Sequence, residues 1–92
     1  MKKKNVTIIL RERRGACACH RGHQVGDRFD YASERGKLCP LAMHVAFPYI
    51  DIIRYGGEAP RVRDGRILFS CPDPDVLNIF ELVPEEQPDD QE

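Results

Sequence analysis

Tryptophan is absent from this chain, and so is any long hydrophobic run. Between the N-terminal lysines and Arg11, only the stretch of residues 6–10 is mainly apolar. That stretch is too short for a membrane span, which needs ~20 apolar residues, and for the hydrophobic region of a signal peptide. We therefore expect a cytoplasmic protein that does not enter a membrane.

The short motifs of several large enzyme classes are missing as well. The sequence contains no phosphate-binding loop, no dinucleotide fingerprint, no Gly-x-Ser-x-Gly and no His-Glu-x-x-His. It also lacks a nucleic-acid-binding motif, although residues 1–84 carry 14 basic against 10 acidic residues. We interpret this excess as a solvated surface, so nucleic acid is not an expected partner. A protein partner stays open.

The size of the chain favours a single domain. Its 92 residues, 41% hydrophobic and 32% charged, are typical of an ordinary globular protein with a modest core. The acidic segment 85–92 contains no apolar side chain with which to offset the entropy of ordering. We therefore predict a globular domain over residues 1–84 and a disordered tail over residues 85–92.

Four segments have the character of strands. They are rich in β-branched and aromatic residues or alternate between apolar and polar positions. Gly26 suggests a bulge in the second of them, and the Pro-Asp-Pro-Asp turn at 72–75 predicts a hairpin between the last two. The predicted strands cover residues 5–10, 24–31, 66–71 and 76–83.

One segment, residues 40–55, has a helical period. Its apolar stripe consists of Leu41, Ala42, Val45, Ala46, Tyr49, Ile50 and Ile53. Pro40 suits the first helical position, whereas Pro48 predicts a kink or a split into two helices. The order β-β-α-β-β gives an α+β fold, in which this kinked or split helix packs on a small, mainly antiparallel sheet.

The chain resembles a family of small prokaryotic proteins without an assigned activity. The resemblance rests on five motifs in order: Cys-x-x-Gly-His at 19–23, Gly-Asp-x-Phe at 26–29, Cys-Pro at 39–40, Arg-Tyr-Gly-Gly at 54–57 and Cys-Pro-Asp at 71–73. It covers about residues 5–83. Two positions depart from the family pattern: Arg61 stands where the family often has tryptophan, and Cys17 is an additional thiol. The resemblance implies a shared site without naming its chemistry.

The cysteines and one histidine form the candidate site. Without a secretory signal, free thiols or metal ligands are favoured over disulfides. Cys19, His23, Cys39 and Cys71 each lie near the end of a predicted element, so we expect them to converge at one edge of the sheet. Three thiolates and an imidazole suit a zinc ion. We therefore predict a zinc-binding module, an iron–sulfur cluster being the less favoured cofactor.

Two alternatives stay open. Cys39 precedes the predicted helix, and the helix dipole favours a thiolate there, which would suit a thiol-dependent redox protein or enzyme centred on Cys39. His23 or His44 would then assist, and Cys71 would be the resolving thiol. In the other alternative the cysteines are packing residues and the protein is a non-catalytic interaction subunit.

Overall fold

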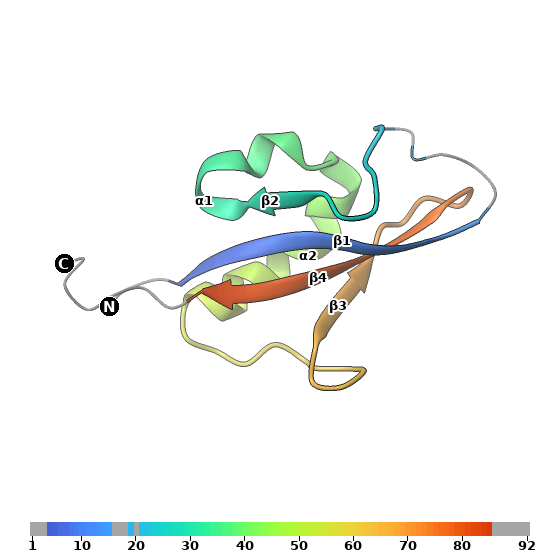
Figure 1. The fold of residues 1–92 in the computed structure, drawn as a ribbon. Coiled ribbons are helices and arrows are strands. Elements are labelled where there is room, and N and C mark those ends of the chain that lie inside the picture. The colour runs from blue at the N-terminus through green and yellow to red at the C-terminus, as the bar shows by residue number, and fades with distance from the viewer. Residues whose placement is uncertain (1–3, 16–18, 20, 86–92) are drawn as a thin grey trace.

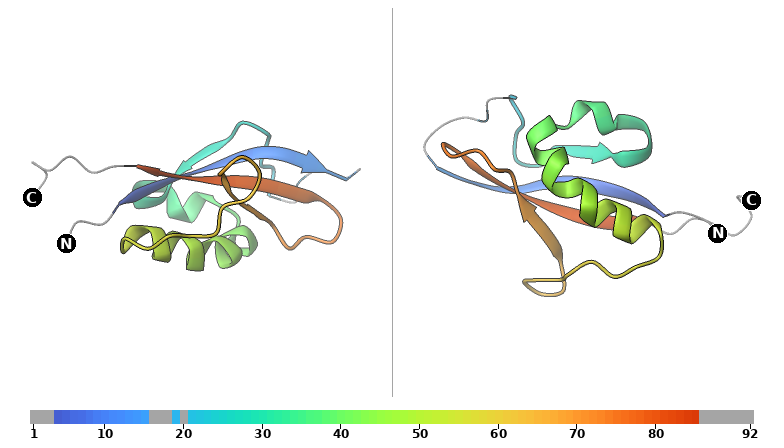
Figure 2. Two further views of the ribbon diagram at one scale, coloured as in Figure 1. Left: turned by 90° about the horizontal axis from the view of Figure 1, so that it is seen from below. Right: turned by 180° about the vertical axis from the view of Figure 1, so that it is seen from behind.

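The computed structural model describes residues 4–15, 19 and 21–85. Four strands form one antiparallel sheet in the order β2-β1-β4-β3 (Figure 1). The strands are β1 (Asn5–Arg14), β2 (Arg28–Asp30), β3 (Ile67–Ser70) and β4 (Leu77–Glu85). Helices pack on one face of this sheet (Figure 2). The predicted α+β fold is thereby confirmed.

The two long strands β1 and β4 form the centre of the sheet. Their ladder runs from the pair Asn5 and Glu85 to the pair Arg14 and Leu77. β1 extends well past its predicted end at Leu10. Its charged second half is accommodated because residues 12–14 resume the pairing with β4 after a register shift at Arg11, whose Nε lies 2.8 Å from a Glu81 carboxylate oxygen. The connection to the next strand therefore begins only after Arg14.

The edge strand β2 is shorter than the predicted strand over residues 24–31. Before it, Leu10 of β1 faces two residues, because its carbonyl accepts from the Gly26 N–H (2.8 Å) and its N–H donates to the Asp27 carbonyl (3.0 Å). This two-against-one pairing is that of a β-bulge. Asp27 also accepts from the backbone N–H of Gln24 (2.9 Å), which closes the turn as the sequence predicts.

The segment after β2 is helical, although the sequence predicted only one helical segment, residues 40–55. It consists of α1 (Tyr31–Glu34) and the 3-10 helix η1 (Arg35–Lys37). The Asp30 carboxylate accepts from the Ser33 N–H (3.0 Å) and so caps α1. The capping by Asp30 therefore stabilises a helical segment here, although Gly36 has a low helix propensity.

The main helix α2 (Pro40–Arg54) is continuous, so of the two predicted outcomes at Pro48, a kink or a split, the split does not occur. Pro48 leaves the carbonyl of His44 without its helical donor. Both residues are exposed, however, and water on that side can replace the missing donor. The helix ends as predicted before Gly56, whose φ of 89° is left-handed.

The core lies between the sheet and α2. It combines Val6, Ile8 and Leu10 of β1 with Phe80 and Leu82 of β4, all 0–1% exposed. From α2 it receives Ala42, Ala46, Ile50 and Ile53, a narrower stripe than predicted. Leu41, which we placed in that stripe, is 54% exposed because it lies at the first turn, beyond the edge of the core.

The end of β4 modifies the predicted domain boundary. Glu85 belongs to the strand and accepts hydrogen bonds from the side chains of Thr7 and Asn5. The remainder of the predicted tail, residues 86–92, lies outside the described residues. In the described part of the chain, none of the helices combines the length and the apolar character that a membrane span requires.

Candidate functional site

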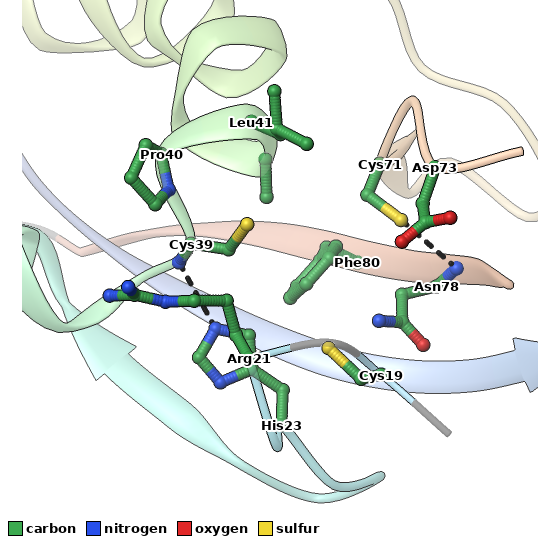
Figure 3. A pocket seen from close by; sticks show the side chains of 11 residues that line it. Cys19, Arg21, His23, Cys39, Pro40, Leu41, Cys71, Asp73, Asn78 and Phe80 are labelled. Atoms are coloured by element: carbon green, nitrogen blue, oxygen red, sulfur yellow. Dashed lines mark hydrogen bonds between the residues drawn. The ribbon is translucent and has the colours of Figure 1, made fainter. Parts of the chain in front are cut away.

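The four predicted site residues line one cavity of about 270 Å³, which we call the thiol cavity. Cys19 and His23 reach it from the β1–β2 connection, Cys39 from the residue before α2, and Cys71 from the end of β3 (Figure 3). The ring of Phe80, from β4, lies between the three sulfur atoms (Figure 3). All four side chains thus line one cavity, at the end of the sheet remote from the Asn5–Glu85 pair.

Cys19 is the first residue of a tight turn, and the backbone that follows curves back towards the Cys19 sulfur. The Gly22 N–H donates to the Cys19 carbonyl (3.0 Å), and Gly22 has a φ of 81°, which favours glycine. Burial by itself would raise the pKa of Cys19. Hydrogen bonds from the backbone N–H groups of Arg21 and His23, from the Asn78 side chain and from the Gly22 N–H outweigh it, so the net pKa is lowered.

Asn78 is a functional residue that our sequence reasoning missed. It is only 2% exposed. Its Oδ1 accepts from Arg13 Nε (3.2 Å), which leaves the amide NH₂ to donate to Cys19. The signal was present in the sequence, because residues 76, 78, 80 and 82 share the core face of β4 and Asn78 alone among them is polar.

His23 is buried and makes a specific structural contact. Its Nε2 accepts from the backbone N–H of Cys39 (3.0 Å), which places the proton on Nδ1. The ring also packs edge-on against Phe29, with centroids 5.0 Å apart. Burial lowers the pKa of His23; Asp27 opposes this shift, and Arg21 and Arg13 reinforce it. The neutral side chain of His23 therefore links the segment before β2 to the residue before α2.

Cys39 occupies the N-cap position of α2, as predicted. Its side chain makes no capping hydrogen bond, and the residue is half-buried. Its sulfur points into the thiol cavity instead (Figure 3). His44, the other histidine considered as its helper, is exposed on α2 and does not line this cavity.

Cys71 is integrated into the hairpin between β3 and β4. Its sulfur accepts from the Asn78 N–H (3.4 Å) and lies 3.5 Å from the Val76 carbonyl, to which the thiol donates. Its backbone N–H donates to the Asn78 carbonyl (3.0 Å). Nearby, Asp73 accepts from the Asp75 N–H (2.9 Å), which is the turn chemistry expected of Pro-Asp-Pro-Asp. Cys71 thus has a structural role in this turn.

The predicted zinc ligands do not form a ready-made metal site among the described residues. Among the described residues, no three His, Cys, Asp or Glu side chains are placed to hold a metal ion together. The Nε2 lone pair of His23 is engaged by the Cys39 N–H, and the sulfur of Cys71 is engaged by the hairpin backbone. These residues would have to exchange partners before they could share an ion, and the zinc site stays a prediction.

The remaining lining of the thiol cavity is mostly apolar. Phe80, Ala42, Pro40 and Leu41 supply carbon surface, and exposed Arg21 and half-buried Asp73 are its charged members. Such a cavity with a few fixed polar groups is typical of a small-molecule site.

Comparison of the chain with described protein families, curated proteins and solved structures finds no match. The family resemblance therefore stays a prediction.

Proposed function

We propose that this protein is a thiol-dependent redox protein whose reactive nucleophile is Cys19. The observation that carries the proposal is the surroundings of this sulfur. Burial alone would raise the pKa of this thiol, yet hydrogen bonding lowers it overall, and the Cys19 side chain lines the thiol cavity. A thiolate, not a thiol, is the attacking species in thiol chemistry.

This proposal moves the reactive centre from Cys39 to Cys19. Cys39 faces the same cavity and is the second thiol of the proposed site. In an attack on a disulfide, the Cys19 thiolate forms a new S–S bond to one substrate sulfur. The other substrate sulfur leaves as a thiolate with the bonding electrons. Once the Phe80 ring between the two sulfurs moves aside, Cys39 attacks the Cys19 sulfur, releases the bound half and completes a two-electron reduction of the substrate.

The test is the reaction of the reduced protein with an aromatic disulfide that releases a coloured thiolate. We expect a fast phase from Cys19, which is lost in Cys19→Ser and retained in Cys71→Ala. Cys17→Ser, the neighbouring thiol in the sequence, is the matched control and should also retain it. A fast phase that survives in Cys19→Ser and disappears in Cys39→Ser would contradict the assignment.

A zinc-binding module is the second candidate, because three thiols and an imidazole line one cavity. Metal analysis of protein purified without chelator and without a histidine tag distinguishes the two. Stoichiometric zinc, together with thiols that react only after a chelator is added, would favour the zinc module over the redox protein. Metal-free protein with a fast Cys19 phase would favour the redox protein.

A further inference from the structure

We infer that the two arginines over the Tyr31 ring form a binding site for a phosphate group, separate from the thiol cavity. Arg35 follows Tyr31 by one helical turn, and Arg54 reaches the same ring from the end of α2. Arg54 is also the first residue of the Arg-Tyr-Gly-Gly motif, which the proposed thiol chemistry leaves unexplained. The inference does not depend on that chemistry.

Two positive charges lie close together on this ring. The guanidinium carbon of Arg35 is 4.5 Å from the Tyr31 ring centroid, and that of Arg54 is 5.0 Å from it. Both distances lie within the ~6 Å of a cation–π contact. The ring attracts each cation, but the two cations repel each other. An anion bound to both guanidinium groups would relieve this repulsion.

No carboxylate compensates these two charges within the described part of the chain, where neither arginine forms an ion pair. The acidic residues beside Tyr31 in the sequence are engaged elsewhere. The Asp30 carboxylate accepts from Ser33 and Asn5. Glu34 accepts from the Asp30 N–H (2.9 Å) and from Lys37 (3.2 Å). The positive charge of the pair is therefore left for a ligand.

Both side chains are held in place and still keep donors for that ligand. Arg54 uses its Nε–H on the carbonyl of Lys4 (3.2 Å), which leaves its two terminal nitrogens. Arg35 uses only Nη1, on the Tyr31 hydroxyl (3.4 Å). Tyr31 itself is 3% exposed and forms a fixed base, whereas Arg35 is exposed and Arg54 is half-buried. A ligand can therefore reach the guanidinium groups from solvent.

The C-terminal end of α2 does little to oppose an anion here. The partial negative charge of a helix end lies on its last free carbonyls. In α2 the backbone N–H groups of residues 55–57 donate to the carbonyls of residues 51–53. Carbonyls that already accept a hydrogen bond repel an anion less than free ones do.

A phosphate group suits two arginines better than a carboxylate does. A carboxylate can be compensated by one guanidinium through two parallel hydrogen bonds. A phosphate ester carries a charge of about −1.5 to −2 at pH 7 and has three strong acceptor oxygens. It can therefore accept from both guanidinium groups at once. The planar fork of arginine favours this recognition over that by a lysine.

The experiment titrates the full-length reduced protein with inorganic phosphate at constant ionic strength and follows the arginine Nε–H signals by NMR. We expect saturable shifts for Arg35 and Arg54. Arg35→Gln and Arg54→Gln should each weaken binding about tenfold or more, since each removes hydrogen bonds to a charged group. Arg66→Gln removes the same charge from the exposed hairpin 62–66 and should bind as the wild type does.

Acetate at the same ionic strength separates a phosphate site from a general anion site, and it should give no saturable shift. Glycerol phosphate distinguishes the source of the group: tighter binding than that of inorganic phosphate identifies an ester, and weaker binding identifies the free ion.

Linear shifts with phosphate, equal binding of acetate, or wild-type binding in Arg35→Gln would overturn the inference. Circular dichroism checks the folding of each variant. If Arg54→Gln unfolds because the Lys4 carbonyl loses its donor, the exposed Arg35→Gln variant still decides the question.

Discussion

At the scale of single residues, the turn at Cys19 depends on the left-handed backbone of Gly22. An alanine there is strained although its Cβ would meet no atom within 4 Å. Gly22→Ala should cost roughly 1–2 kcal/mol of stability. It should also raise the pKa of Cys19, because the turn must open and move its N–H donors. Denaturant unfolding and alkylation rates check both effects.

Gly36→Ala is the matched control for this substitution. Gly36 also has open space around its Cα, but its φ is not left-handed. The control should therefore leave both stability and Cys19 reactivity near the wild-type values. Equal effects of the two substitutions would contradict the role given to Gly22.

His23 gives the protein a defined dependence on pH. Its pKa is lowered in the folded state, so the unfolded chain binds a proton first as pH falls. The stabilisation is complete above the unfolded value of ~6.5 and is lost progressively as pH falls below it. Melting temperatures of the wild type should therefore fall on acidification through this range.

His23→Gln keeps an acceptor for the Cys39 N–H but does not titrate, so it should flatten this part of the pH profile. His44→Gln, on the exposed side of α2, is the control and should retain the wild-type slope. A variant at position 23 that keeps the full slope would show that another group causes it.

At the scale of elements, β1 and β4 together orient the amide of Asn78. Arg13 of β1 holds its oxygen, and the amide nitrogen faces Cys19. In Asn78→Asp the carboxylate can still accept from Arg13 but replaces the donor to Cys19 with a negative charge. The pKa of Cys19 should therefore rise, because a like charge disfavours the thiolate.

Alkylation rates against pH measure this shift. Asn5→Ala, at the far end of the β1–β4 ladder, should leave the Cys19 profile unchanged. An Asn78→Asp protein with an unaltered profile would show that the Asn78 donor does not act on Cys19.

The continuous helix α2 contains a proline that lowers its stability. Exposed Pro48 interrupts the hydrogen bonds of α2 at a typical cost of ~3 kcal/mol, partly offset because proline also restricts the unfolded chain. Pro48→Ala should raise the melting temperature. Pro40→Ala is the control, since proline at the first helical position costs little. A loss of stability in Pro48→Ala would instead indicate that its ring packs productively.

At the scale of the whole molecule, the sequence predicted the fold class and the site region better than the contacts within them. Strand and helix periods follow from local pattern, so the existence of four strands and one main helix was predicted, although the bounds of β1 and β2 differ. The pairing of β1 with β4 and the full length of β1 depend on long-range hydrogen bonds that local pattern does not contain. Asn78 was missed for a related reason, since its importance comes from a partner on another element.

The reactive thiol also could not be chosen from the sequence. The position of Cys39 directly before the predicted helix favoured a thiolate there, and this position is confirmed. The pKa of Cys19 is lowered only when its turn closes and β4 brings Asn78 beside it. The thiol cavity is assembled from several elements in this way, which is why motif order alone predicted where the site lies but not which sulfur reacts.

The central claim, that the surroundings of Cys19 lower the pKa of its thiol, is tested most directly by its alkylation rate as a function of pH. The measurement uses the Cys17→Ser protein, so that the modified peptide reports Cys19 alone. The account predicts a midpoint below the ~8.5 of a free cysteine. A midpoint at or above that value, in a protein that remains folded throughout the titration, would contradict it.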